Sequence, residues 1–121
     1  MCLLVDPTRT DKPNRPLTYY KVILQEDRRG LYFNKLYSVG SVIKASGLLW
    51  SDVDKSKGQI NAGAIHVYTS RRQAEHKSIL YSTMTEGRIP SMVIEVECLP
   101  ENFVAWGVGE EAAFTEVRVM T

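Results

Sequence analysis

The sequence is poor in the features that most often reveal a function directly. It holds only two cysteines, Cys2 and Cys98, among 121 residues, which excludes a disulfide framework. It has no apolar run approaching the ~20 residues that a membrane-spanning helix needs. Its formal net charge of +1 lacks the strongly basic balance of a dedicated nucleic-acid-binding protein. We therefore expect a cytoplasmic protein that binds neither membranes nor nucleic acid.

Signatures of catalysis and metal binding are missing as well. The two histidines and two cysteines have no ligand spacing, so we predict no metal site. Asp52 and Asp54 resemble a fragment of a calcium loop, but the glycine and the distal carboxylate of such a loop are misplaced. The sequence has neither a glycine-rich phosphate loop nor a nucleophile elbow, and we expect no cofactor.

What the chain does contain is an ordinary globular composition preceded by an unusual N-terminal stretch. Residues 6–17 combine three prolines with alternating charges, which disfavours both helix and central strand. We therefore predict an arm or linker at residues 1–17 and a single globular domain at residues 18–121. The apolar segment Cys2–Val5 is expected to dock on the sheet or on a second copy, which would give a homo-oligomer.

Alternating apolar and polar side chains predict the first strands of this domain. In the segment 19–25, the alternation groups Tyr20, Val22 and Leu24 on one face, which we expect to point inward. The segment 63–69 is predicted to be a second strand, because it is short, apolar and rich in β-branched and aromatic residues.

The last third of the chain predicts two more strands. The segment 91–99 has the clearest alternation in the sequence, and the segment 112–120 is predicted to form one continuous strand. If these two strands pair, Arg118 lies opposite Glu95 or Glu97. Two carboxylates on one face would then be balanced by an arginine on the neighbouring strand.

A helix is predicted directly after the strand at 63–69. Ser70 is followed three residues later by Gln73, which is the pattern of a capping box, so we expect a helix over about residues 71–81. The longest irregular section precedes that strand, at residues 46–62. The expected fold is therefore α+β, with a mixed or antiparallel twisted sheet of about five to seven strands and one short helix. A partly open barrel is the alternative.

Candidate binding residues gather around the start of this helix. His66 and Tyr68 alternate along one strand and share a face, while Arg71 and Arg72 occupy the first helical turn, where free backbone amides favour an anion. Trp50 adds an aromatic side chain from the preceding irregular section. We expect these residues to bind an unidentified protein or a small anionic ligand, although the same pattern also fits a half-buried strand beside a solubilising surface.

The order of several short motifs resembles a family of small uncharacterised bacterial and phage proteins. The resemblance covers residues 19–120 and implies no activity. It rests on the motifs Tyr20-Lys21-Val22, Gly63-Ala64-Ile65-His66-Val67-Tyr68, Val93–Val96, Phe103-Val104 and Val117–Val119.

A strand ending in Tyr68-Thr69, followed by a helix containing Ala74 and then an apolar strand, is similar to one module of the ADP-ribosyltransferase fold. This resemblance implies that Tyr68 stacks on a nicotinamide ring and that Glu95 or Glu97 is the catalytic acid. The chain is short for that fold and lacks its arginine- or histidine-bearing first strand.

Taken as a whole, the sequence predicts a small cytoplasmic binding or accessory protein, of phage or mobile-element origin, rather than an enzyme. The competing hypothesis is a small ADP-ribosyltransferase-like or other enzyme that uses Tyr68 together with Glu95 or Glu97.

Overall fold

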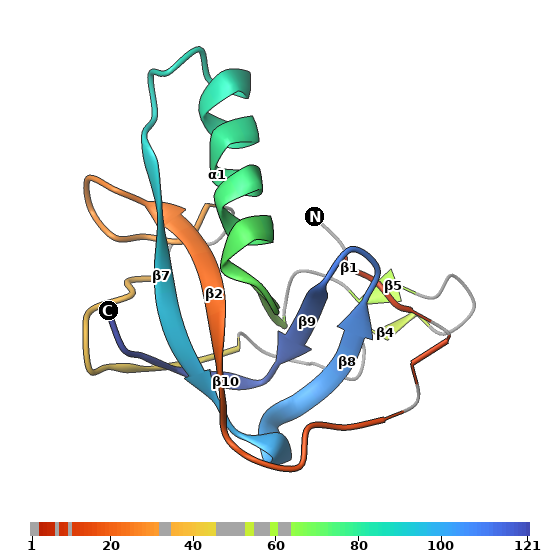
Figure 1. The fold of residues 1–121 in the computed structure, drawn as a ribbon. Coiled ribbons are helices and arrows are strands. Elements are labelled where there is room, and N and C mark those ends of the chain that lie inside the picture. The colour runs from red at the N-terminus through yellow and green to blue at the C-terminus, as the bar shows by residue number, and fades with distance from the viewer. Residues whose placement is uncertain are drawn as a thin grey trace.

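The computed structural model describes residues 3–6, 8–9, 11–31, 35–45, 53–54, 59–60 and 64–121. Within these ranges, seven strands form one antiparallel sheet, three two-residue strands form a smaller sheet, and one α-helix lies against the large sheet (Figure 1). The elements are β1 (Leu3–Leu4), β2 (Leu17–Leu24), β3 (Val42–Lys44), β4 (Val53–Asp54), β5 (Gln59–Ile60), β6 (Ile65–Tyr68), α1 (Arg71–Met84), β7 (Ser91–Cys98), a 3₁₀ turn (Pro100–Asn102), β8 (Phe103–Gly107), β9 (Glu111–Phe114) and β10 (Glu116–Val119).

The large sheet is built around one long antiparallel pair. Its strand order is β3-β10-β7-β2-β6-β9-β8. The central strands β2 and β7 pair without interruption from Leu17 opposite Cys98 to Leu24 opposite Ser91. The expected α+β class with an antiparallel sheet is confirmed, and α1 begins at the predicted residue but continues three residues beyond the expected end.

The segment predicted as one strand at 112–120 forms two strands, β9 and β10. Only Thr115 separates them, yet three strands lie between them in the sheet. Two residues of extended chain span at most roughly 7 Å, so the sheet must curl to bring Phe114 close to Glu116. The sheet stays open at β3 and β8, but its curl surrounds the core from several sides.

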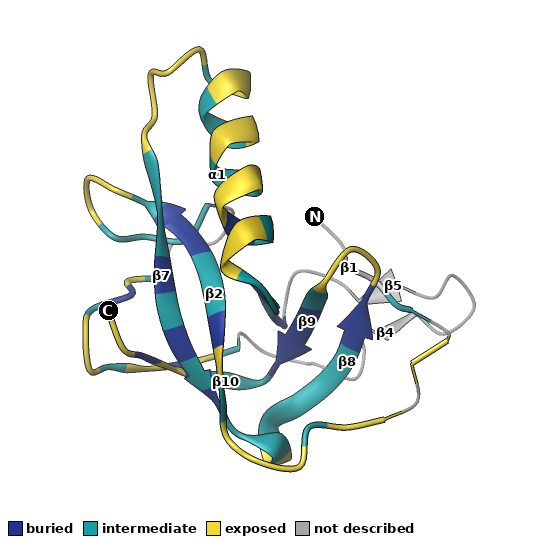
Figure 2. Ribbon diagram, in the orientation of Figure 1, coloured by how far each residue is buried: buried dark blue, intermediate teal, exposed yellow. Residues whose placement is uncertain are grey.

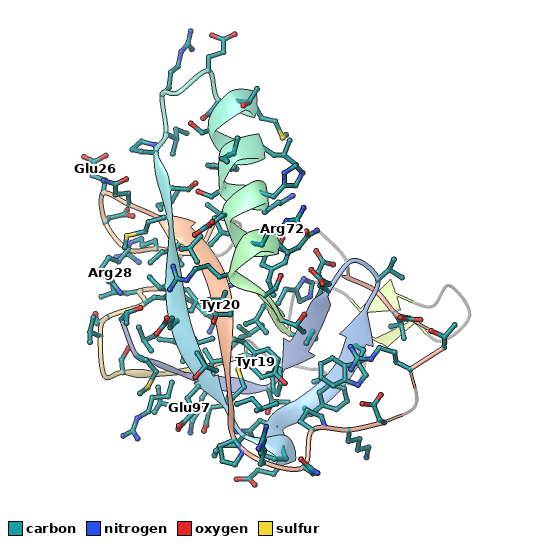
Figure 3. All side chains as sticks on the ribbon, in the orientation of Figure 1. Tyr19, Tyr20, Glu26, Arg28, Arg72 and Glu97 are labelled. Carbon is teal, nitrogen blue, oxygen red and sulfur yellow. The ribbon has the colours of Figure 1, made fainter. Side chains whose placement is uncertain are left out.

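Strand β2 is covered on both faces (Figure 2). The expectation that only the face of Tyr20, Val22 and Leu24 points inward is wrong, because Tyr19 and Ile23 on the opposite face are buried as well. Tyr19 and Tyr20 are adjacent in the chain (Figure 3) and therefore point to opposite sides of the sheet. One side contains the main core, and α1 covers the other.

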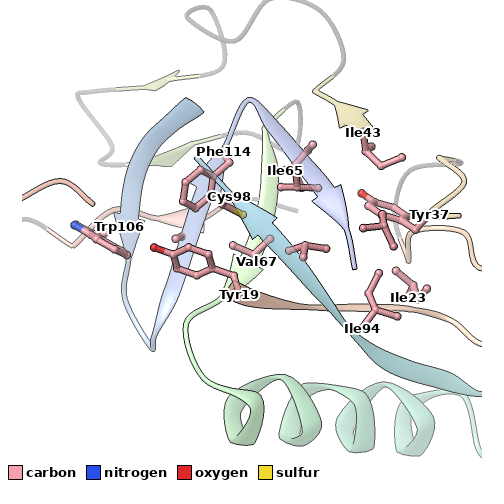
Figure 4. Packing of buried hydrophobic residues seen from close by; sticks show 14 residues of the cluster. Tyr19, Ile23, Tyr37, Ile43, Ile65, Val67, Ile94, Cys98, Trp106 and Phe114 are labelled. Atoms are coloured by element: carbon pink, nitrogen blue, oxygen red, sulfur yellow. The ribbon is translucent and has the colours of Figure 1, made fainter. Parts of the chain in front are cut away.

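The main core fills the inside of the curl (Figure 4). Aromatic rings pack at one end of it, where the ring centroids of Tyr19 and Phe114 lie 5.1 Å apart and those of Phe103 and Trp106 lie 4.9 Å apart. Aliphatic side chains from β2, β6, β7 and β10 fill the remainder. The buried members are Tyr19, Ile23, Tyr37, Ile43, Ile65, Val67, Ile94, Val96, Cys98, Trp106, Ala112, Phe114, Val117 and Val119.

The N-terminal arm docks on β8, a strand that the sequence pattern does not predict. Val5 pairs with Gly107, and the Asp6 amide donates to the Trp106 carbonyl at 3.0 Å. The indole nitrogen of Trp106 donates to the Asp11 carbonyl at 2.9 Å, and the Arg9 guanidinium lies 3.8 Å from the centre of the Trp106 ring system. These contacts cover the outer edge of β8 with the chain's own arm. The formation of a homo-oligomer through the arm stays a prediction.

The section predicted as irregular, residues 46–62, is described only at β4 and β5. These two short strands pair with each other, and β5 also pairs with β1. The prediction is therefore wrong at these four residues, while Trp50 and Cys2 lie outside the described part of the chain.

Candidate functional site

The start of α1 is held in place by its own cap and by the turn before β9. The Ser70 side chain accepts a hydrogen bond from the Gln73 amide at 3.2 Å, as the capping pattern predicts. The Ser70 hydroxyl also lies 3.0 Å from a Glu110 carboxylate oxygen, to which it donates. The Thr69 amide donates to the Glu110 carbonyl at 2.8 Å. Strand, turn and helix therefore meet at a fixed point.

Beside this point, four side chains form a row across the sheet. Glu95 on β7 lies opposite Tyr20 on β2, Tyr20 lies opposite Tyr68 on β6, and Tyr68 lies opposite Glu111 on β9. Directly opposed residues of neighbouring strands share a face, so all four point to the side that α1 covers. We call Glu95, Tyr20, Tyr68 and Glu111 the tyrosine–carboxylate row.

Arg71, in the first turn of α1, closes one end of the row. Its guanidinium donates to the Glu95 carboxylate at 2.8 Å and lies 5.2 Å from the centre of the Tyr20 ring. A second guanidinium nitrogen lies 4.0 Å from the Glu75 carboxylate, one helical turn further on. Arg71 therefore contacts three side chains of its own chain, although about half of its side chain is exposed.

Glu111 closes the other end of the row. Burial raises the pKa of its carboxyl group, while the positive charge of Lys77 and a hydrogen bond with the Tyr68 side chain lower it. Tyr68 itself is buried between Val22 and Ala74. The two tyrosines and two carboxylates of the row thus stabilise the helix–sheet contact.

The structure brings together only some of the predicted site residues. Tyr68 and Arg71 meet at the row, together with Glu95 from the enzyme hypothesis. Tyr68 and Glu95 lie on strands separated by β2, so their backbones are about 10 Å apart and Tyr20 lies between them in the row. The expected pairing of Glu97 with Arg118 is confirmed, since the two lie opposite each other on β7 and β10.

The other predicted residues lie elsewhere. His66 is partly buried on β6, opposite Ala113, and Arg72 is exposed on the side of α1 that faces away from the sheet. A shallow depression among the described residues lies at the end of α1, and it includes none of the predicted site residues. It is lined by Met84, Thr85, Glu86, Arg88 and Ile89.

Lys21 is a chemically unusual residue that the sequence pattern does not single out. Its side chain points into the curl of the sheet, where its ammonium donates to the His66 carbonyl at 2.9 Å and lies 5.5 Å from the centre of the Tyr37 ring. Burial lowers the pKa of Lys21 to about 8. Strands β2 and β6 pair through a single residue pair, Tyr20 and Tyr68, so the lysine supplies a donor where the backbone ladder stops.

The described residues contain no group of three or more potential metal-ligating side chains. In the same part of the chain, neither helix combines the length and the apolar character needed to cross a bilayer. Comparisons of the chain with models of known protein families, with curated proteins and with solved structures return no match. Fold and site therefore define an α+β protein with a curled antiparallel sheet and a helix on one face. The two family resemblances stay predictions.

Proposed function

We propose that this is a small binding or accessory protein and that it contacts a protein partner through the exposed side of α1. One observation carries the proposal. Arg71 and the carboxylates of the tyrosine–carboxylate row contact one another or neighbouring side chains, whereas the large apolar side chains of the same helix face solvent. A surface of this kind suits association better than catalysis.

The side chains of α1 are distributed opposite to the usual amphipathic pattern. Towards the sheet the helix presents Ala74, which is fully buried, and Ser78, whose hydroxyl lies 2.6 Å from that of Ser91. Towards solvent it presents Ile79, Leu80 and Met84, which are 65%, 44% and 78% exposed. A surface helix ordinarily buries its large apolar residues against the core. We call the exposed residues Arg72, His76, Ile79, Leu80, Thr83 and Met84 the α1 outer face.

The engaged state of the tyrosine–carboxylate row supports a binding role over an enzymatic one. Tyr68 is buried by Val22 and Ala74, so a ring stacked on nicotinamide would first have to leave this packing. Glu95 already accepts a hydrogen bond from Arg71 at 2.8 Å. A small anion would also compete with Glu95 for Arg71, which favours a protein partner over a small anionic ligand.

We also propose a cytoplasmic location. Cys98 is a free and buried thiol, and burial raises its pKa far above the usual range. This state is compatible with a reducing compartment. Origin in a bacterium or phage stays a prediction from the sequence motifs.

The proposal is tested by affinity capture with purified wild-type protein and the variant Ile79→Glu. Val39→Glu is the matched control, because Val39 is 62% exposed and lies in a turn outside α1. A partner retained by the wild type and by Val39→Glu, and lost with Ile79→Glu, is the expected result. Equal capture by all three proteins would show that the partner does not bind to the α1 outer face.

The enzyme hypothesis has its own measurement. Thermal unfolding with and without NAD, for the wild type and Tyr68→Phe, is expected to show no shift in the midpoint. A rise with NAD that Tyr68→Phe abolishes would contradict the binding proposal, because a ligand specific for the folded state stabilises it.

A further inference from the structure

The α1 outer face carries a positive charge, Arg72, near its start, and a negative charge, Glu86, follows just beyond its end. We propose that its partner is a second copy of this chain, with the two α1 helices packed antiparallel across a twofold axis near Ile79 and Leu80. This inference rests on the proposed function, because it names the partner of the surface identified there.

The positions of the charges fit this arrangement. At 1.5 Å per residue, Arg72 lies roughly 11 Å before the midpoint between Ile79 and Leu80. Glu86 follows the helix by two residues in a left-handed turn (φ 55°), so it lies near the C-terminal end of α1, on the other side of that midpoint. An antiparallel copy centred on this midpoint therefore brings Arg72 of each chain beside Glu86 of the other. A parallel copy would instead bring Arg72 against Arg72.

Both charges are available for such a contact. Arg72 is exposed and makes no ion pair within the described part of the chain. Among the described residues Glu86 forms an ion pair with Arg88 alone, at 3.3 Å, and more than three quarters of each side chain is exposed. An exposed pair of this kind contributes little to stability, so replacing it with an intermolecular pair costs little.

The apolar residues supply the centre of the contact. Ile79 and Leu80 lie at the midpoint, and each would meet its counterpart across the axis. Packing them removes apolar surface from water, which is the main driving force for association. Twofold symmetry makes each favourable contact occur twice.

The shape of the molecule leaves room for a second helix. The C-terminal part of α1 and the adjoining start of β7 project away from the rest of the sheet (Figure 1), and the side of α1 turned away from the sheet is exposed along its length (Figure 2).

Sedimentation equilibrium over micromolar to millimolar concentrations tests the proposal. The wild type is expected to form dimers as its concentration rises. Ile79→Glu is expected to weaken dimerisation on the order of tenfold or more, which corresponds to about 1.4 kcal/mol. Val39→Glu is expected to leave it unchanged. Circular dichroism of each variant checks that α1 is retained.

A charge exchange tests the antiparallel arrangement itself. Arg72→Glu and Glu86→Arg are each expected to weaken dimerisation, and the double variant Arg72→Glu/Glu86→Arg is expected to restore it. A wild type that stays monomeric at millimolar concentration, or a double variant no better than the single ones, would overturn the inference.

Together with the capture experiment, these results separate the two proposals. A monomeric wild type whose captured partner is lost with Ile79→Glu would refute self-association and leave the binding function standing. If Ile79→Glu alters neither capture nor association, both proposals fail.

Discussion

Lys21 shows how strongly the fold changes the chemistry of one residue. Its neighbours Tyr19 and Ile23 on the same face of β2 are buried core residues, and the lysine reaches the backbone of β6 from among them. Removing a positive charge from water disfavours the protonated form, which is why the pKa falls from 10.5 to about 8. Below about pH 8 the Lys21 charge is present in both the folded and the unfolded chain. The cost of burying that charge then reduces the free energy of unfolding by its full amount.

The Lys21 contribution to stability is therefore expected to rise with pH above about 8. There the unfolded chain still holds the Lys21 proton that the folded chain has released. The Lys21 contribution to the free energy of unfolding should increase on the order of 2 kcal/mol between pH 8 and 10, measured as the difference between urea titrations of the wild type and of Lys21→Met. Other buried groups act in the opposite direction. Burial raises the pKa of Cys98 above its ordinary 9.0 and that of Tyr19 from 10.0 to about 12, so their ionisation in the unfolded chain above about pH 9 opposes folding in both proteins.

Lys21→Met is the control for this effect, since it keeps the length of the side chain without the titrating group. The variant is expected to lack this contribution, so the wild type should gain stability relative to the variant as the pH rises from 8 to 10. Equal pH dependence in the two proteins would show that Lys21 is not responsible.

At the scale of single elements, Ser70 is the residue on which α1 depends most clearly. Its side chain satisfies the Gln73 amide and donates to Glu110. Ser70→Ala is expected to reduce the free energy of unfolding by about 1 kcal/mol, within the usual range for a lost N-cap. Ser70→Thr keeps the hydroxyl and should lose less. Thr83→Ala, at an exposed position of the same helix, is expected to be nearly neutral in the same urea titrations.

Elements governed by neighbouring residues could be predicted from the sequence. The capping pair Ser70 and Gln73 predicts the start of α1, and alternation predicts β7 and the pairing of Glu97 with Arg118. The inward face of β2 could not be predicted from alternation, because α1 covers one face and the curl covers the other. Strand β8 was missed because its burial depends on β9 and on the N-terminal arm, both distant in sequence.

The candidate site was predictable only in part for the same reason. Local patterns in the sequence indicate Tyr68, Arg71 and Glu95 separately, but no local pattern shows that Tyr20 and Glu111 complete their row. Ile79 and Leu80 would be assigned to the core on composition alone, yet small residues occupy the helix–sheet contact. The exposed surface of α1 is therefore a property of the fold.

At the scale of the whole molecule, Phe114 links the two sides of the curled sheet. It is fully buried, contacts the rings of Tyr19 and Phe103, and immediately precedes the bend at Thr115. Phe114→Ala is expected to lower the free energy of unfolding by about 3–5 kcal/mol, because it leaves a cavity in the core. Phe103→Ala should cost less, since Phe103 is only partly buried. Comparable losses in the two variants would contradict this account of the core.

The late position of β10 in the chain has a consequence for protein synthesis. This strand lies between β3 and β7, and it is the strand with which β3 pairs in the described sheet. A nascent chain that has already released α1 and β7, but not β8, β9 and β10, still exposes the unpaired edges of β7 and β6 and the apolar side chains that the last three strands cover. Until residue 119 has left the ribosome, we therefore expect the growing polypeptide to bind chaperones that cover unpaired strands.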